Sequence, residues 1–536
     1  MNVFIVTALT LFAASKQSAG PSLSIDFISN RHRINPDIYG MNDNTGSVDV
    51  GLAKELKLPA ARWGGDATTR YNWLNDGTNA GFDWYFMAGS GNANPVPGAS
   101  SEAFIDRAKV NGTKAVLTVP IIDYINSATN WDCSFPVSIF GAQQSVNPYV
   151  HPIVNGAQTD AGNSISSAGQ QLTLTNSQIL RIHVPNSTAL AQGWVKHLVS
   201  KYGKASANGV PIYQLDNEPS GWANTHRDIH PVAPTYQEIL QKSEAYALAI
   251  KQADPSASVL GPSDFGWPAY VGTPSLNGGL WNAPYYLQQM AATSASQKVR
   301  LLDYFDEHYY PTSDNGVGAI ANSPAGDAAT QANRIRSTRS LWDPTYVEND
   351  WIGQYYGAIY LIPRMRAWIS TYYPGTKLAI TEYNFGAPES INGAITQADA
   401  LGIFGREGVD LATVWGPPTP TQPAAFAFRM FRNFDGKGGQ FGDYSYLSTS
   451  ADQSQLAIYG SNRSYDNVMT VMVINKTAQD LRSTLAISHC RAPKNVAVYS
   501  YSSANLATIV RGNNLNGSAQ GLTATFPADS ITLLVW

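Results

Sequence analysis

The pattern that most restricts the fold of this chain is an alternation of short apolar runs with amphipathic stretches of helical period. Short apolar runs bounded by turn residues are typical of buried strands, whereas apolar residues spaced by three and four are typical of helices. A strand followed by a helix, repeated eight times, predicts an α/β fold, the (β/α)₈ TIM barrel. The eight runs are IYGM (38–41), AARWG (60–64), KAVLTVPI (114–121), IYQLD (212–216), SVLGPS (258–263), LLDYFDEHYY (301–310), KLAITEY (377–383) and LATVW (411–415).

Two segments interrupt the simple alternation. Residues 131–180 are rich in Gly, Asn, Ser and Gln and follow the third predicted strand, and residues 311–352 follow the sixth. In a barrel both segments belong to the loops at the C-terminal ends of the strands, the face that holds active sites. They are therefore either walls of a binding site or decoration of the barrel.

The pattern changes from about residue 424, where short strands follow one another with turn-rich gaps and no helical period. Such a run predicts a β-sandwich domain. The early alternating segment LSIDF (23–27) has no partner in the predicted barrel, so we expect it to join the sandwich. The predicted domains are an N-terminal strand (21–33), the catalytic barrel (34–423) and the β-sandwich (424–536).

The N-terminus and the cysteines bear on localisation. An apolar run, VFIVTALTLFAA, is followed by small residues, which predicts a secretory signal peptide over residues 1–20 with cleavage near Ala19 or Gly20. The alternative is a buried first helix. We expect a secreted, extracellular protein. Only Cys133 and Cys490 are present, so we expect two free thiols, with a single disulfide as the alternative.

Composition narrows the class of partner. The formal net charge is −4 and charged residues make up 14% of the chain, which argues against nucleic acid or an anionic membrane as the partner. The chain also holds 13 Trp and 28 Tyr. These side chains either fill a large aromatic core or stack on neutral, flat-faced ligands such as sugar rings.

Two glutamates stand at the ends of predicted barrel strands. IYQLDNEPS (212–220) runs into Glu218, and Pro219 ends the strand, whereas Glu382 closes LAITEYNFG (378–386) on the face of Leu378 and Ile380. Glycosidic bond cleavage requires such a pair, one protonated carboxyl and one ionised carboxylate. Strands four and seven lie roughly across the barrel mouth, so the two carboxylates should converge there. The structural alternative is two helix caps or surface ion pairs.

Other carboxylates compete for these roles. Glu307 at the end of the sixth strand is a rival catalytic group, although Asp303, Asp306 and Glu307 are better explained as neighbours that orient the pair. Asp216 shares the face of Glu218 one step deeper in the barrel, where a buried supporting role is expected.

The chain resembles glycoside hydrolase family 44, the endo-β-1,4-glucanases and xyloglucanases. The matching segments are INPDIYGMN (34–42), RWGGDATTRYNWLNDGTNAGFDWYF (62–86), YQLDNEP (213–219), GPSDFGW (261–267), LLDYFDEHYYP (301–311) and ITEYNFG (380–386). The resemblance implies a (β/α)₈ barrel with a β-sandwich. It also implies a retaining mechanism with Glu218 as acid/base and Glu382 as nucleophile.

The resemblance implies further binding residues. Arg62, together with Tyr309 or His308, is expected beside the nucleophile, and Asn217 is expected to bond the sugar 2-hydroxyl. Trp415 is expected to form the floor of the central subsite. Four other tryptophans either stack on further glucosyl rings or pack in the core: Trp63, Trp84, Trp342 and Trp351. Asp66 stands where the family pattern suggests Asn, which puts a charge near the cleft.

The expected partner is a polysaccharide, a β-glucan or xyloglucan, with no nucleic acid, no membrane and a monomeric chain. No cofactor is expected for catalysis. The resemblance allows a structural calcium, but no EF-hand-like run marks its ligands. Two other functions remain open: another retaining barrel hydrolase, such as a xylanase or an arabinofuranosidase, and a non-catalytic carbohydrate-binding protein.

Overall fold

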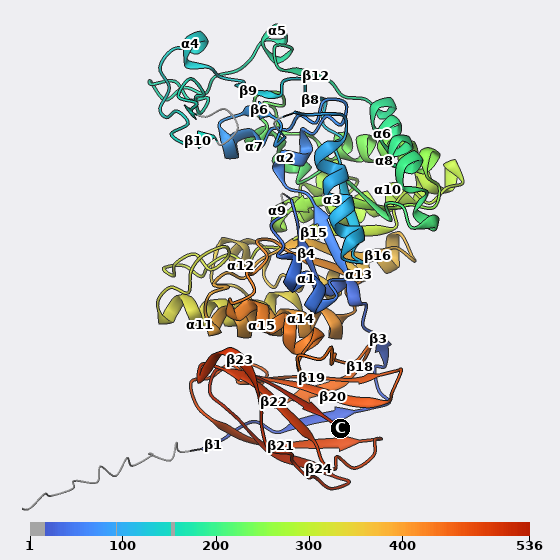
Figure 1. Ribbon diagram of the computed structural model, residues 1–536, viewed down its shortest axis with the longest axis vertical. Coiled ribbons are helices and arrows are strands. Elements are labelled where there is room, and N and C mark those ends of the chain that lie inside the picture. The colour runs from blue at the N-terminus through green and yellow to red at the C-terminus, as the bar shows by residue number, and fades with distance from the viewer. Residues whose placement is uncertain (1–16, 45, 93, 152–155) are drawn as a thin grey trace, which may run out of the picture. The chain divides into compact units, whose positions relative to one another are not determined.

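The chain forms two compact units. The computed structural model describes residues 17–536 apart from 45, 93 and 152–155. One unit joins the N-terminal segment up to His32 with Gln440–Trp536, and the other comprises Arg33–Gly439 (Figure 1). The apolar run of the predicted signal peptide falls in residues 1–16, outside the described residues, and its predicted cleavage point falls at strand β1 (Ser18–Ala19).

The larger unit contains a closed barrel of eight parallel strands, which confirms the predicted fold class. Strands that follow one another in the predicted alternation also lie next to one another in the barrel, as short strand–helix–strand connections require. In chain order the strands are β4 (Gly40–Asn42), β5 (Ala60–Trp63), β7 (Lys114–Val119), β13 (Ile212–Leu215), β14 (Ser258–Phe265), β15 (Tyr304–His308), β16 (Lys377–Tyr383) and β17 (Leu411–Val414).

A layer of buried side chains fills the barrel interior. Seven strands each contribute one residue: Ala60, Val116, Ile212, Leu260, Tyr304, Ala379 and Leu411. The layer lies toward the N-terminal half of these strands, so the interior is a packed core and the polar inner residues gather at the other end. The chemistry of the barrel is therefore confined to the C-terminal ends of the strands.

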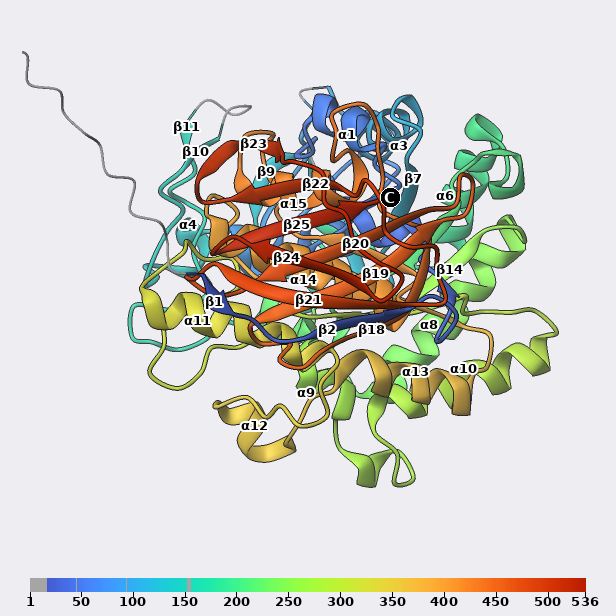
Figure 2. The same cartoon turned by 90° about the horizontal axis from the view of Figure 1, so that it is seen from below.

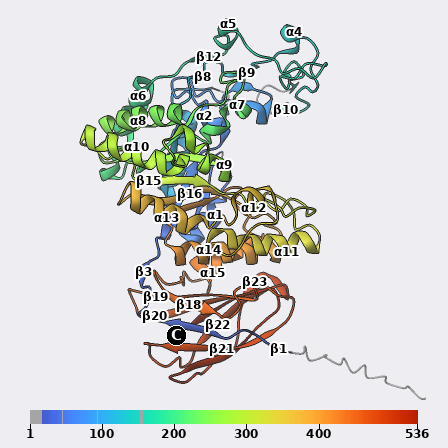
Figure 3. The same cartoon turned by 180° about the vertical axis from the view of Figure 1, so that it is seen from behind.

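Helices cover the outside of the barrel. Neighbouring long helices pack side by side, as α6, α8 and α10 do in Figure 3. The longer helices are α1 (Val50–Leu56), α3 (Ala99–Val110), α6 (Thr188–Tyr202), α8 (Tyr236–Ala253), α10 (Asn282–Gln297), α11 (Ala328–Ser337), α13 (Leu361–Tyr372), α14 (Ile391–Glu407) and α15 (Pro423–Arg432). Side-chain oxygens of Ser187, Thr235, Asp327 and Ser390 cap the starts of α6, α8, α11 and α14.

The loops after β5 and β7 form a small layer of their own at the C-terminal ends of the strands (Figure 1). β6 (Met87–Gly89) pairs with β9 (Asn130–Cys133), and β8 (Tyr124–Asn126) pairs with β12 (His183–Pro185). These pairs frame the excursion over 131–180. The short helices of these and later loops are α2 (Asp66–Thr69), α4 (Val137–Phe140), α5 (Asn176–Ile179), α7 (Trp222–Thr225), α9 (Gly266–Val271) and α12 (Trp351–Tyr356).

The boundary between barrel and sandwich differs from the predicted one. The prediction ended the barrel at residue 423, whereas the larger unit continues to Gly439. Residues Pro423–Arg432 form α15, the helix after the eighth strand, which packs against α14 and α1. This helix is strongly apolar on one face, but its first residue, Pro423, is the last residue of the predicted barrel, so the rest of it was assigned to the predicted sandwich.

The smaller unit is built from one continuous sheet path, β1-β21-β2-β18-β19-β20-β25-β22-β23, with β24 paired to β21 (Figure 2). The early strand β2 (Leu23–Asp26) lies between β18 and β21, as predicted. The other strands are β18 (Tyr444–Ser450), β19 (Leu456–Arg463), β20 (Val468–Asn475), β21 (Leu481–Ser488), β22 (Ala497–Ser502), β23 (Asn505–Arg511), β24 (Gly521–Phe526) and β25 (Ser530–Val535). One apolar core that includes Leu23, Leu485 and Phe526 joins them into a sandwich.

The described residues settle two smaller points. Cys133 and Cys490 are both free thiols. Within the described part of the chain, helices are either too short or too polar to span a bilayer.

Candidate active site

Glu218 stands where β13 turns over the rim of the barrel. Asp216 and Glu218 both have left-handed backbone conformations, with φ of 60° and 49°, and Pro219 then begins a short helical turn. The backbone N–H of Glu218 donates to the carbonyl of Ser263 on β14 at 2.9 Å. Surrounding structure holds this sparsely populated conformation, which is common at functional sites. The Glu218 side chain is 26% exposed.

Glu382 lies on β16, with its side chain directed into the barrel mouth. It is 7% exposed, and three groups contact its carboxylate. Arg62 Nη1 donates to Oε1 at 2.6 Å, the Tyr310 hydroxyl donates to Oε2 at 2.8 Å, and His308 Nδ1 lies 3.6 Å from Oε2. These charge-assisted contacts favour the ionised form.

The two glutamates face one another across His308. His308 Nδ1 lies 2.9 Å from Glu218 Oε1, and one atom each from Glu218, His308 and Glu382 fall within 4.8 Å of one another. All but His308 line a cavity of about 360 Å³, whose walls are Gly65, Asp66, Asp83, Asn217, Glu218, Phe265, Gly266, Tyr310, Glu382 and Trp415. The cavity combines two carboxyl groups in different environments, the arrangement that acid-assisted displacement requires.

Arg62 connects the residues around Glu382. It is fully buried, and besides Glu382 it donates Nε–H to Gln214 Oε1 at 2.7 Å, Nη1–H to Asn42 Oδ1 at 2.9 Å and Nη2–H to Asn217 Oδ1 at 2.7 Å. The acceptors come from β4, from β16, and from β13 with the residue Asn217 that follows it. These bonds use four of the five N–H groups of the guanidinium, and its position fixes both Glu382 and Asn217.

Opposing effects act on the ionisation of Glu382 and His308. Burial raises the pKa of Glu382, but the charges of His308 and Arg62 and the bonds from Arg62 and Tyr310 outweigh burial and hold it below its ordinary range. Burial lowers the pKa of His308, but the Glu382 charge and the bond to Glu218 raise it overall. The site therefore keeps Glu382 ionised and gives His308 a proton to share with Glu218.

The structure brings Asn217 and Trp415 to the same cavity. Asn217 Oδ1 accepts from Arg62 and from the Gly65 N–H at 3.1 Å, and its amide donates to Asp66 at 3.0 Å. Trp415 follows β17 and lies against Gly65, where a Cβ would come within 2.7 Å of the indole. Only glycine leaves room for this ring at that position.

Tyr310, and not Tyr309, contacts the carboxylate of Glu382. Tyr309 is 3% exposed, and its hydroxyl bonds Glu348 at 3.3 Å on the other side of the strand. Asp306, His308 and Tyr310 share the inner face because side chains alternate along a strand. The sequence already indicated this choice. Adjacent residues on a strand face opposite sides, so if His308 points into the barrel, Tyr309 cannot.

Trp63 and Trp84 differ from the expectation of open sugar-stacking faces. Trp63 is 5% exposed, and its ring packs edge-on against Tyr71 with centroids 4.8 Å apart, so it is a core residue. Trp84 is half-buried and already stacks on Tyr149 at 5.1 Å. Neither ring lines the cavity with Glu218 and Glu382.

Trp342 and Trp351 occupy different environments. The Arg406 guanidinium covers the Trp342 ring at 4.3 Å, and Arg406 lies in the last turn of α14. Because barrel helices run antiparallel to the strands, that turn lies at the N-terminal ends of the strands, away from Glu382. Trp342 is therefore not a sugar-binding residue. Trp351 begins α12 and is 45% exposed.

Glu307 and Asp216 do not line the cavity. Glu307 is fully buried and lies on the outer face of β15, next to His308. Asp216 is also buried and accepts bonds from the Thr69 hydroxyl at 2.7 Å and the Ile121 N–H at 2.6 Å. These contacts match a supporting role for Asp216 and remove Glu307 as a rival catalytic group.

Replacing Glu307 by glutamine is expected to stabilise the protein at neutral pH. Burial first, and then the charges of Asp264 and Asp306, raise the pKa of Glu307 well above its ordinary range. The native state then binds a proton that the unfolded chain releases, so stability falls as pH rises above the unfolded pKa. Glutamine does not titrate and so avoids this loss of stability. The Tm should therefore rise by about 1–3 °C at neutral pH and change little in acid. Thermal unfolding at the two pH values tests this, and a lower Tm at neutral pH would contradict it.

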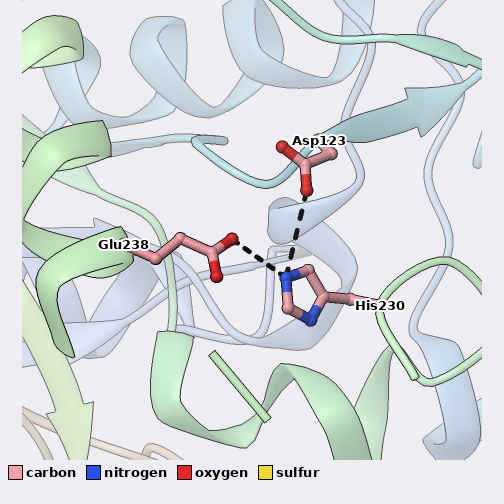
Figure 4. Close-up of side chains that lie close together, drawn as sticks. All are labelled: Asp123, His230 and Glu238. Atoms are coloured by element: carbon pink, nitrogen blue, oxygen red, sulfur yellow. Dashed lines mark hydrogen bonds and ion pairs between the residues drawn. The ribbon is translucent and has the colours of Figure 1, made fainter. Parts of the chain in front are cut away.

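A second group of metal-ligand types lies outside the cavity (Figure 4). His230 Nε2 lies 3.0 Å from Glu238 and 3.9 Å from Asp123, and the Lys242 ammonium bonds Asp123 and lies 3.6 Å from Glu238. Calcium prefers six to eight oxygen ligands. A set with two carboxylates, an imidazole and an ammonium does not fit it, and the group is better described as an ion-pair network around Lys242.

Several cavity residues had no role in the sequence analysis. Asp83 lines the cavity from the 3-10 turn Gly81–Trp84, and Phe265 and Gly266 line it from the end of β14 and the start of α9. Gln214 and Asn42 hold Arg62. Gln214 was detectable, because it precedes Asp216 by two on β13 and so shares the inner face. The residues at the ends of elements and in turns carry no periodic signal, and only their contacts reveal them.

A family model, curated proteins and solved structures all relate this chain to glycoside hydrolases of one family. The model of glycoside hydrolase family 44 matches residues 77–313. Endoglucanase A of Paenibacillus lautus is 32% identical over 489 residues, which cover 87% of this chain and 65% of that protein. This chain spans 65% and 39% of the lengths of the two curated relatives it matches.

Solved structures share both the fold and appreciable sequence identity with this chain. CelM2, a bifunctional glucanase-xylanase from a metagenome library, superposes with a TM-score of 0.90 at 37% identity, covering 97% of this chain and 99% of that one. A xyloglucanase from glycoside hydrolase family 44 of Paenibacillus polymyxa superposes with a TM-score of 0.80 at 30% identity, again covering 97% and 99%.

Proposed function

We propose that this chain, which belongs to glycoside hydrolase family 44, is a secreted enzyme that cleaves internal β-1,4-glucosidic bonds of cellulose-type glucans or xyloglucan with retention of configuration. The observation that carries the proposal is the approach of Glu218 and Glu382, which offer oxygens within 4.8 Å of one another across the barrel mouth. Retaining glycosidases hold their carboxyl groups about 5–5.5 Å apart, whereas inverting enzymes leave room for a water at about 6.5–9.5 Å.

The first step is a displacement at the anomeric carbon. A Glu382 carboxylate oxygen forms the bond to that carbon, and the bond from the carbon to the glycosidic oxygen breaks. Glu218 gives its proton to the departing oxygen, so the leaving chain departs as an alcohol. Arg62 and Tyr310 donate to Glu382 at 2.6 and 2.8 Å, which orients the nucleophile and keeps it ionised.

The second step reverses the roles. Water adds to the anomeric carbon, Glu218 takes the proton of that water, and Glu382 departs as a carboxylate. The reaction uses only the two carboxyl groups and water, so we propose that no cofactor takes part in catalysis.

His308 is suited to follow the changing charge of Glu218. The Thr381 hydroxyl donates to Asp306 at 2.5 Å, so its oxygen is free to accept from His308 Nε2, 3.3 Å away. With Nε2 protonated, Nδ1 of a neutral imidazole accepts the proton of Glu218 at 2.9 Å. When Glu218 is ionised, the same nitrogen donates to it once the ring has taken a proton from water and become an imidazolium, the form that the raised pKa of His308 favours.

Aromatic rings in the cavity and exposed aromatic rings on α12 suit a polysaccharide. Trp415 and Phe265 line the cavity itself, and Phe265 is 40% exposed. The helix α12 carries Trp351, Tyr355 and Tyr356, all exposed. Flat apolar faces with polar edges match glucosyl rings, so we propose Trp415 as the floor of the central subsite and Trp351 as an outer platform.

The test is product analysis on xyloglucan, carboxymethyl-cellulose, xylan and arabinan. The expected result is mid-chain cleavage of the β-glucans, with the β-anomer appearing first in proton NMR. A first-formed α-anomer would overturn the retaining mechanism. Activity confined to arabinan would overturn the substrate class, and binding without cleavage would favour a carbohydrate-binding protein.

Xylanase activity is a second candidate. A similar protein, CelM2, is described as a glucanase-xylanase and shares 37% identity with this chain. Xylan and glucan have the same β-1,4 backbone geometry, and a pocket discriminates weakly between substrates that differ by one small group. The ratio of kcat/KM on xylan to kcat/KM on carboxymethyl-cellulose tests this candidate. Comparable values would show both xylanase and glucanase activity, and a negligible value on xylan would leave glucanase activity alone.

A further inference from the structure

Strand β14 carries a bulge beside Glu218. The register between β14 and β15 shifts between Pro262 and Asp264, and the intervening Ser263 has a left-handed backbone, with φ of 58°. A bulge bends the strand and redirects the groups around it. Here the Ser263 carbonyl accepts from the Glu218 N–H at 2.9 Å, so the bulge contacts the turn that carries the proposed acid/base.

Asp264 makes a second connection to the same turn. This aspartate is fully buried. The Ser220 N–H donates to its Oδ1 at 3.1 Å, the Ser220 hydroxyl donates to its Oδ2, and the Phe265 N–H donates to its Oδ1 at 3.0 Å. All three partners are donors, so Asp264 serves as an acceptor, the role of an ionised carboxylate. Residues 218 and 220 are thus both bonded to the bulged end of β14.

The Glu218 carboxyl depends on this turn for its position. Three groups contact the carboxylate of Glu382, whereas the Glu218 side chain is 26% exposed and bonds His308. The Glu218 backbone has a φ of 49°, a conformation that is sparsely populated for residues other than Gly. Bonds at residues 218 and 220 stabilise this conformation, and the conformation determines where the carboxyl lies.

We propose that Asp264 is a positioning residue for proton transfer: through Ser220 it holds the turn 218–221 so that the Glu218 carboxyl stays within reach of the glycosidic oxygen. The inference rests on the proposed function and adds to it a residue outside the cavity. Proton transfer requires hydrogen-bond contact between the acid and the departing oxygen. Displacement of the turn therefore slows the steps in which Glu218 gives or takes a proton, while attack by Glu382 continues.

The ionisation of Asp264 is compatible with this role. Burial raises the pKa of Asp264 to about 6, and the Glu218 charge also raises it, although the bonds from Ser220 and Phe265 lower it. The group is therefore mostly ionised at neutral pH, the form that accepts all three bonds.

The test compares substrates that need protonation of the leaving group with substrates that do not. In Asp264→Ala, kcat/KM on a soluble glucan should fall by about 10–10²-fold, because a misplacement of about 1 Å can cost that much. On 2,4-dinitrophenyl β-cellobioside, kcat/KM should stay within about threefold, because this leaving group needs no proton from Glu218. A general collapse of the site would slow both substrates equally.

Two further variants keep the test decisive if Asp264→Ala folds poorly. Asp264→Asn keeps an oxygen for the N–H groups of Ser220 and Phe265, and its amide can donate to the Ser220 hydroxyl, so glucan cleavage should stay within about threefold. Ser220→Ala removes the hydroxyl bond from a half-buried position. Its kcat/KM on glucan should fall by about 3–10-fold, the cost of about one hydrogen bond, with the aryl glycoside unaffected.

A matched control lies at the other end of the same strand. Asp254 is also fully buried. It accepts from the Ser256 hydroxyl at 2.6 Å and from the N–H groups of Ser256 and Ala205 at 3.0 and 2.7 Å. It precedes β14 and so lies at the N-terminal ends of the strands, away from Glu218. Asp254→Ala should leave the ratio of the two kcat/KM values unchanged.

A second measurement does not depend on turnover. The N–H groups of Ser220 and Gly221 should exchange with solvent faster in Asp264→Ala than in the unaltered protein, and Asp254→Ala should not change them. If no substrate is cleaved but the exchange follows this pattern, the proposed function fails and the hold of Asp264 on the turn stands. If cleavage occurs and Asp264→Ala slows both substrates equally, or neither, the positioning role fails alone.

Discussion

Glu382→Gln is expected to lower kcat on every substrate by about 10⁴–10⁶-fold, because an amide cannot form and then release the glycosyl bond. Glutamine is the substitution that removes the carboxylate with the least change to the contacts of this position. Its amide oxygen can still accept from Arg62, and its amide nitrogen can face the Tyr310 oxygen, so both contacts at 2.6 and 2.8 Å have substitutes. The expected loss therefore reports chemistry and not collapse of the site.

The variant also tests the electrostatics of the site. The pKa of Glu382 is lowered in the folded state, so its ionised form stabilises the fold above the unfolded pKa, and this stabilisation is lost as pH falls through the folded pKa. Glu382→Gln should therefore lower Tm at neutral pH and have a smaller effect in acid. Near-normal turnover would show that Glu382 is not the nucleophile.

A matched control is available in Glu348. This buried glutamate bonds Ser340 and Tyr309 outside the cavity, and burial raises its pKa to about 7. Glu348→Gln removes a buried carboxyl of the same barrel without touching the reacting groups. Its kcat should stay within about threefold of the unaltered value, because packing effects alone change catalysis little when the site is intact.

Glu218→Gln is expected to lower kcat on polysaccharides by about 10²–10⁴-fold, the usual contribution of general acid–base catalysis. Both steps should slow, since Glu218 gives a proton in the first and takes one in the second. Aryl glycosides with good leaving groups need no protonation in the first step. With these substrates a rapid burst of phenol should be followed by slow turnover as the glycosyl-enzyme accumulates.

Azide provides the decisive control for this assignment. It attacks the glycosyl-enzyme without a general base, so it should restore turnover of aryl glycosides by Glu218→Gln and yield a β-glycosyl azide. It should not rescue Glu382→Gln, which forms no intermediate. Equal losses on activated and natural substrates, with no azide effect, would rule out Glu218 as the acid/base.

Much of the fold was predictable because strand and helix periods are local. Each of the eight predicted barrel strands overlaps an observed one, and the early strand LSIDF lies within the sandwich. The Pro219 signal placed Glu218 at the rim. These features depend on residues that are adjacent in the sequence, so they could be predicted without knowledge of any tertiary contact. Alternation with Leu378 and Ile380 did not explain the inward direction of Glu382, because Ala379 is the interior residue of β16 and the register shifts between Ile380 and Tyr383.

The binding residues were less predictable. Tyr310 was missed although alternation indicated it, and Trp63 and Trp342 were named because they are tryptophans near predicted loops. Whether an indole is a platform or a core residue depends on what covers it, here Tyr71 and Arg406. Such partners lie on other elements of the barrel, and composition does not specify them.

The amino-acid sequence by itself determined the barrel, the sandwich and the strand ends that carry Glu218 and Glu382, because hydrophobic periodicity encodes which face of an element is buried. Only the tertiary structure decided the Arg62 contacts, the interposed His308 and the hydrogen bond from Asn217 to Asp66. The physical reason is that burial, hydrogen-bond partners and ionisation arise between residues far apart in the chain. They become defined when the closed barrel brings the C-terminal ends of its strands to one mouth.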